Sequence, residues 1–213
     1  MRVTLKLATS LDGRIATAAG ESRWITGEAA REASHRLRAV HDAVLVGVAT
    51  VIADDPALTV RLAGYGGDQP TRVVLDSRQR IPPGSKLVAG AGDAPVIVVS
   101  TTAANKALTD AGVVVLQVAE DGGRVDIRAA MAALDGEGLT SVMVEGGGEV
   151  AASVLRAGLV DRLEWFRAPM LLGGEGRPAV AGLGLNRLAD ATWFRRLSTE
   201  SLGEDLWERY ERA

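Results

Sequence analysis

The sequence of 213 residues contains no cysteine and only two histidines. The lack of cysteine excludes disulfides, thiol nucleophiles and cysteine-ligated zinc. His35 and His41 are six residues apart and do not share a helical face well, so no metal site is expected. Both are expected on the solvent side of the first helix or at its end. The chemistry is therefore expected to come from carboxylates, lysine or a bound cofactor.

Strong charge and long apolar runs are also missing. A net charge of −3 and a pI near 5.5 give no electrostatic reason to expect nucleic acid or an anionic membrane. No apolar run approaches the roughly 18 residues that span a bilayer, and no signal peptide is visible. With 47% apolar residues, the chain is expected to be a globular cytoplasmic protein. No linker or repeat interrupts it, so residues 1–213 are expected to form one domain.

Short apolar runs alternate with segments of helical spacing, which favours an α/β fold with a largely parallel sheet. The C-terminal quarter differs, because strands follow one another there without helices, as in an antiparallel edge. Thr26 is expected to cap a first helix that runs to Val40. Further helices are expected at 49–51, 103–111 and 125–134. Strands are expected at 3–8, 15–16, 42–47, 71–76, 96–100, 113–116, 162–169, 193–199 and 206–212.

The stretch SVMVEGGGEVAASVLRA, residues 141–157, reads as strand, glycine turn and helix. Its glycines would let the backbone approach a ligand, and the helix N-terminus would offer N–H groups to a phosphate. A tight connection without a ligand explains the three glycines equally well. Gly146, Gly148 and Ala151 match the dinucleotide-binding fingerprint, and Glu164 follows at about the expected distance. This fingerprint belongs at the first strand–helix turn of its fold, whereas several expected strands precede these glycines, and Glu164 falls inside an expected strand. A Rossmann domain is therefore the less favoured interpretation.

Other polar positions are weak signals when taken singly. Ser77 and Arg78 follow a strand and could hold a phosphate, although an ordinary turn explains them better. Lys6 is unusual within an apolar strand, where a buried ammonium needs a partner or ligand.

Taken in order, these pieces form a recognisable set. They are LKLATSLDG (5–13), GESRWIT (20–26), LR (37–38), HDAVLVG (41–47), TVIADDPALTVR (50–61), DS (76–77), VEGG (144–147), AGLVD (157–161), AP (168–169) and LLGG (171–174). The set resembles the reductase domain of bacterial riboflavin biosynthesis, which is the C-terminal domain of the bifunctional pyrimidine deaminase/reductase family. The resemblance covers nearly the whole chain.

The resemblance implies a dihydrofolate-reductase-like three-layer fold with a mostly parallel mixed sheet, antiparallel C-terminal strands and helices on both faces. It also implies a homodimer and an NADPH-dependent oxidoreductase. The implied reaction reduces 5-amino-6-(5-phosphoribosylamino)uracil, or its non-deaminated form, to the ribitylamino product. Hydride would pass from the nicotinamide C4 to the ribose C1′, with an acid assisting ring opening.

The family pattern also implies roles for individual residues. NADPH contacts fall on Ala8, Trp24, Thr50, Asp54, Ser77 and the segment 147–153, which includes Gly147, Gly148, Glu149 and Val150. Substrate contacts fall on Ser22, Arg38, Leu58, Arg61 and Glu145, with the two arginines suited to the 5′-phosphate. The candidate catalytic residues are Lys6, Asp54 and Glu145.

Two departures from the family pattern stand out. No cysteines and no His-x-Glu motif are present for a deaminase zinc site, so the chain is expected to be a stand-alone reductase that relies on a separate deaminase. Arg167 stands where an apolar residue is expected, which could indicate a paralogue with a different substrate. The alternatives are a dihydrofolate-reductase-like paralogue that reduces a pterin and a non-catalytic nucleotide-binding protein.

Overall fold

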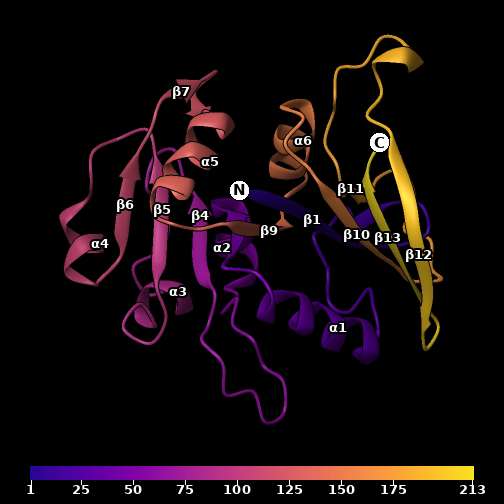
Figure 1. The fold of residues 1–213 in the computed structure, drawn as a ribbon, viewed down its shortest axis with the longest axis horizontal. Helices are drawn as coiled ribbons and strands as arrows, with labels where there is room; N and C mark the ends of the chain where they lie inside the picture. Colours follow the sequence, from indigo (N-terminus) through magenta and orange to yellow (C-terminus); the bar gives the residue numbers. More distant parts are fainter. The chain divides into compact units, whose positions relative to one another are not determined.

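The computed structural model describes residues 1–213, and the chain forms two compact units (Figure 1). The first unit contains residue 1 and residues 35–143, and the second contains residues 2–34 and 144–213. The chain passes from one unit to the other within α1 (Glu28–Ala39) and within β9 (Ser141–Gly146). The expectation of a single domain stays a prediction.

The first unit is built on four parallel strands in the order β3, β4, β5, β6. These strands are β3 (Ala43–Gly47), β4 (Thr71–Leu75), β5 (Val96–Ser100) and β6 (Val114–Gln117). The apolar runs of β3 to β5 are almost entirely buried, as expected for parallel strands covered on both faces. One apolar cluster joins five of their valines to Leu58, Leu87 and Leu108; these valines are Val44, Val46, Val74, Val96 and Val98.

Four helices belong wholly to the first unit: α2 (Val48–Asp54), α3 (Lys86–Ala89), α4 (Lys106–Asp110) and α5 (Ile127–Gly136). Side-chain caps begin three of them: Ser85 accepts from the N–H of Val88, Asn105 from that of Ala107, and Asp126 from those of Arg128 and Ala129. A two-stranded hairpin, β7 (Glu120–Asp121) and β8 (Arg124–Val125), precedes α5.

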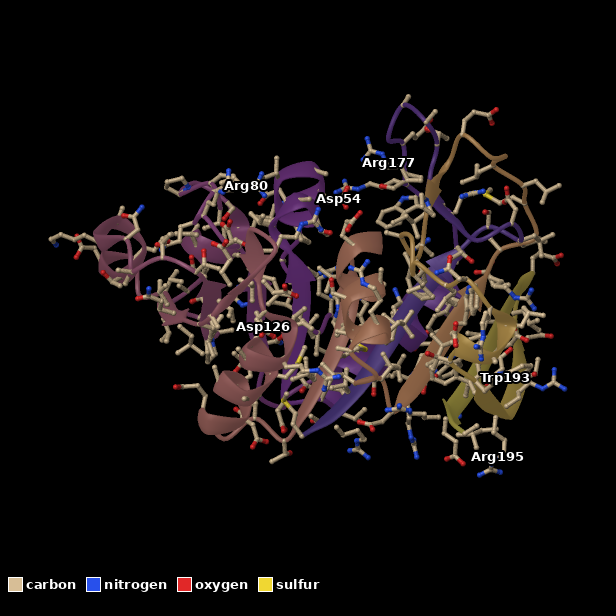
Figure 2. All side chains as sticks on the ribbon, turned by 90° about the horizontal axis from the view of Figure 1, so that it is seen from above. Asp54, Arg80, Asp126, Arg177, Trp193 and Arg195 are labelled. Atoms are coloured by element: carbon tan, nitrogen blue, oxygen red, sulfur yellow. The ribbon has the colours of Figure 1, made fainter.

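The second unit contains strands in the order β12, β13, β10, β1. Strand β1 (Arg2–Thr9) is parallel to β10 (Arg162–Arg167), whereas β13 (Asp205–Arg212) and β12 (Phe194–Leu202) add antiparallel neighbours. Strand β12 is largely exposed, and Figure 2 shows the labelled Arg195 side chain directed away from its ribbon. A short pair, β2 (Arg14–Ala16) with β11 (Arg177–Pro178), and helix α6 (Gly148–Arg156) complete the unit, apart from a 3₁₀ turn at Leu188–Asp190.

The predicted α/β class, mostly parallel with antiparallel C-terminal strands, is confirmed. Three local predictions need correction. The first helix begins at Glu28, so Gly27 and not Thr26 precedes it. The helix expected at 103–111 is confined to Lys106–Asp110, because Asn105 caps it. The helix expected from residue 125 begins at Ile127, because residues 124–125 pair in the hairpin.

Candidate active site

Three parallel strands of the first unit end at one edge, where several of the expected site residues follow them. Gly47 lies opposite Leu75 in the register, and Leu75 lies opposite Val99. Ligands of open α/β sheets bind at this carboxyl edge. Thr50 follows β3 by three residues and Ser77 follows β4 by two, so the structure brings these two predicted cofactor contacts to the same edge.

Asp54 is the last residue of α2, where Figure 2 labels it. Thr50 and Asp54 are four residues apart in this helix and therefore share a face. A carboxylate at a helix C-terminus meets the negative end of the helix dipole, which disfavours it by about 0.3–1 kcal/mol. Asp54 lies at the end of α2 where the helix dipole disfavours a carboxylate.

The segment after α2 has a strained backbone. Asp55 and Leu58 adopt left-handed conformations, with φ of 40° and 54°, which cost on the order of 1–3 kcal/mol each for residues other than glycine. Asp55 is held by α3, since its Oδ1 accepts from the backbone N–H of Lys86 at 2.8 Å. Leu58 is only 3% exposed and packs in the apolar cluster, so the structure gives this predicted substrate contact a packing role.

Arg38 and Arg61 are brought together by hydrogen bonds between the end of α1 and the strained segment. Nη1 of Arg38 donates to the carbonyl oxygen of Thr59 at 2.8 Å. The backbone N–H of Arg61 donates to Nδ1 of His35 at 3.1 Å. His35, which is partly exposed, therefore faces this segment.

Ser77 lies in a network of hydroxyl groups and backbone groups. Its Oγ accepts from the N–H of Val125 at 2.9 Å, and its carbonyl oxygen accepts from the hydroxyl of Thr101 at 2.8 Å. The Ser77 hydroxyl therefore keeps its own proton to donate. Neighbouring Asp76 is fully buried; one carboxylate oxygen accepts from the N–H of Ile81 at 2.7 Å and the other lies 3.9 Å from Nε of Arg80.

In the second unit, Lys6 and Ala8 lie on one face of β1, opposite Glu164 and Phe166 of β10. The Lys6 ammonium is 5.7 Å from the centre of the Phe166 ring. Glu164 is buried, and its Oε2 accepts from the indole N–H of Trp207 at 2.8 Å. Burial raises the pKa of Glu164, and the bond from Trp207 opposes that shift. Glu164 lies in the middle of its strand, as predicted, and has a partner within the protein.

Gly147 and Gly148, which follow β9, are each needed for a different structural reason. Gly147 has φ of 89°, which requires glycine, and it immediately precedes α6. A Cβ at Gly148 would lie 2.6 Å from the carbonyl oxygen of Pro178, so this glycine permits close packing against the segment after β11. Glu149 lies in the first helical turn, and Glu145 is the penultimate residue of β9.

Trp24 and Ser22 lie in the segment between β2 and α1. Trp24 is 67% exposed, and the guanidinium of Arg31 lies 4.6 Å from the centre of its indole. No pattern in the sequence singles out Arg31, because its contact with Trp24 depends on how this segment turns before the helix.

Asp12 is a second residue that the residue-by-residue predictions missed. Its carboxylate accepts from the hydroxyl of Ser10 at 2.6 Å and from the N–H groups of Leu172 and Gly173 at 3.1 and 2.8 Å. These bonds, that from Ser10 first, lower the pKa of Asp12 to about 2. Asp12 thereby fastens the glycine-rich loop after β10 to the turn after β1.

Arg167, the departure from the family pattern, is accommodated by an ion pair. Its Nη2 lies 2.7 Å from Oε2 of buried Glu208, whose other oxygen accepts from the hydroxyl of Tyr210 at 2.9 Å. The structure contains no group of three or more His, Cys, Asp or Glu side chains that could hold a metal ion. None of its helices is both long and apolar enough to cross a membrane.

Comparisons with known proteins identify the class as reductases of riboflavin biosynthesis. The chain is 39% identical over 211 residues to the 2,5-diamino-6-ribosylamino-4(3H)-pyrimidinone 5′-phosphate reductase of Methanothermobacter thermautotrophicus, covering 98% of this chain and 96% of that protein. It is 37% identical to riboflavin biosynthesis protein RibD of Escherichia coli, covering 96% of this chain and 58% of that protein. The structure of Acinetobacter baumannii RibD matches with a TM-score of 0.88 and 33% identity, over the whole of this chain and 58% of that one.

The family model of the RibD C-terminal domain matches residues 1–207, and the chain belongs to this family. It spans a little over half the length of the bacterial RibD relatives. The resemblance read from the sequence, and with it the class of riboflavin-biosynthesis reductase, is confirmed.

Proposed function

We propose that the chain reduces a phosphoribosylamino-pyrimidine to its ribitylamino form with NADPH as the hydride donor. The observation that carries this proposal is the 39% identity to the archaeal reductase over nearly the full length of both chains. Other relatives include RibD proteins, which the chain matches over only part of their length. Since the name of the archaeal protein specifies a diaminopyrimidinone and a 5′-phosphate, the same class of substrate is proposed here.

The residues present fit a dinucleotide phosphate. The Ser77 hydroxyl can donate to a 2′-phosphate while still accepting from Val125, and Gly147 adopts a backbone conformation closed to other residues. The cofactor, when bound, would supply a hydride to the ribose C1′. By the family pattern Ala8, Trp24, Thr50 and residues 148–150 complete its contacts.

The proposed chemistry assigns the remaining polar residues to the substrate. Ring opening breaks the C1′–O4′ bond and delivers a proton to O4′, and we propose Asp54 or Lys6 for this proton transfer. Arg38 and Arg61 would bind the 5′-phosphate, with Ser22 and Leu58 in supporting contacts, and Glu145 would hold the pyrimidine or the opened ribose. A cytoplasmic homodimer supplied by a separate deaminase is the proposed setting.

The test is to measure the oxidation of NADPH, as the loss of NADPH absorbance, with three substrates in parallel. We expect turnover with the amino or the deaminated phosphoribosylamino-pyrimidine and none with dihydrofolate. Oxidation with dihydrofolate alone would replace this proposal by the pterin reductase. Binding of NADPH without turnover of any of the three would support the non-catalytic alternative.

A further inference from the structure

Trp24 is exposed, but contacts with neighbouring side chains restrict its orientation. Its indole is 67% exposed, and two guanidinium groups lie within cation–π distance of it: Arg31 at 4.6 Å and Arg23 at 5.9 Å from the ring centre. A single exposed apolar side chain is ordinary on a protein surface. A large flat ring that is held by cations and still left open is a surface on which another flat ring can stack.

Arg31 is itself fixed to the backbone of the segment that carries Trp24. Its Nη1 donates to the carbonyl oxygen of Thr26 at 2.9 Å, and its backbone N–H donates to the carbonyl oxygen of Gly27 at 3.2 Å. The N–H of Gly27 donates to Oδ2 of Asp205 at 2.6 Å, and Asp205 is only 5% exposed at the start of β13. The chain of contacts from a buried carboxylate to the indole therefore restricts the orientation of Trp24.

We propose that Arg31 is a positioning residue that presents Trp24 as a stacking surface for a heteroaromatic ring of the dinucleotide cofactor. This inference rests on the proposed function and adds to it a residue to which the family pattern gives no role. Holding the indole in place before binding removes part of the cost of ordering it when the ligand arrives. Arg31 acts through Trp24 and does not itself bind the cofactor.

The test is a double-mutant cycle on NADPH binding, measured as the Kd from the cofactor's fluorescence. Arg31→Ala should weaken NADPH about three- to tenfold, the range of a cation–π contact and one ordered side chain. Arg31→Gln keeps a donor for Thr26 but loses the cation, and it should give a smaller loss. In the Trp24→Ala background, both substitutions should have no further effect. The matched control is Arg187→Ala. It removes an exposed arginine of the same unit that is distant in sequence from Arg31.

The outcomes separate this inference from the proposed function. If the fold losses in NADPH affinity from Arg31→Ala and Trp24→Ala multiply in the double variant, Arg31 acts independently of Trp24. This result would show that Arg31 contacts the ligand directly, and the positioning role is overturned. Unchanged NADPH affinity in both single variants also overturns it, while leaving the proposed function in place. A wild-type protein that binds no NADPH contradicts the proposed function itself. If Arg31→Ala lowers the melting temperature, the double-mutant cycle with Arg31→Gln decides whether Arg31 is a positioning residue. In the Arg31→Gln variant, the KM for the pyrimidine should stay unchanged.

Discussion

Arg38 donates a hydrogen bond from Nη1 to the carbonyl oxygen of Thr59 at 2.8 Å, across 21 positions of the sequence. Two residues further on, the backbone N–H of Arg61 is bound by His35 of the same helix. The strained segment that contains Leu58 is therefore fastened to the end of α1 by one side-chain donor and one ring acceptor. The side chain of Arg38 makes one of these bonds, and the backbone of Arg61 makes the other.

Replacement of the Arg61 side chain leaves the backbone bond to His35 available, so phosphate binding can be tested with that contact kept. We expect Arg61→Ala to raise the KM for the phosphorylated pyrimidine about ten- to a hundredfold, the loss of one charge-assisted hydrogen bond. Arg38→Ala should raise KM similarly and also lower the melting temperature, because Thr59 loses its donor. Steady-state kinetics and thermal unfolding measure both, with Arg187→Ala as control. An unchanged KM in both variants would place the phosphate elsewhere.

Ser77→Asp should reverse the preference between NADPH and NADH. A carboxylate at this position repels a 2′-phosphate, and it can still accept from the N–H of Val125, so the β8 backbone should stay in place. The ratio of kcat/KM for the two cofactors should shift toward NADH by about tenfold or more. Ser77→Ala, which removes the acceptor without adding charge, serves as the comparison. An unaltered ratio in Ser77→Asp would show that the 2′-phosphate binds away from this turn.

Gly148→Ala should destabilise the fold, because the added Cβ would lie 2.6 Å from the carbonyl oxygen of Pro178. Overpacking of this kind costs about 1–3 kcal/mol, measured as the free energy of unfolding in urea. Gly136→Ala is the matched control, since a Cβ there meets nothing within 4 Å at the end of α5. Equal stabilities of the two variants would mean that the segment after β11 yields to the methyl group.

The Asp12 carboxylate should make the stability of the fold depend on pH. Its pKa is lowered from 3.8 to about 2 by the bonds from Ser10, Leu172 and Gly173, so its contribution is complete above about pH 4 and is lost as the pH falls through about 2. Asp12→Asn should be less stable than the wild type at pH 7. The difference in melting temperature should shrink between pH 4 and 2. A difference that stays constant over this range would show that the carboxylate charge is not what holds the loop.

Much of the fold could be predicted because its strands are local apolar runs. The sequence VIVVS was expected as a strand at 96–100 and forms β5 at Val96–Ser100. The short helix α3 was missed, because its four residues, Lys86–Ala89, are too few to show a helical period, although Ser85 caps it locally. The hairpin of β7 and β8 was missed because two-residue strands leave no periodic pattern.

The site residues are predicted only by the resemblance as a whole and stay predictions, since each polar residue taken singly has an ordinary explanation. The structure changes the interpretation of particular residues. Gly148 had suggested a close approach to a ligand, and it makes a close approach to Pro178. The pairing of Arg31 with Trp24 could not be predicted. The two residues are seven positions apart, with Trp24 in an irregular segment and Arg31 in the first turn of α1.

The proposed function depends on hydride transfer to the ribose carbon C1′ of a phosphoribosylamino-pyrimidine. The most direct test is turnover with NADPH deuterated at both C4 positions, followed by mass spectrometry and NMR of the product. We expect one deuterium per product molecule, located at C1′ of the ribityl chain. Product without deuterium, or with deuterium on the pyrimidine ring, would contradict it.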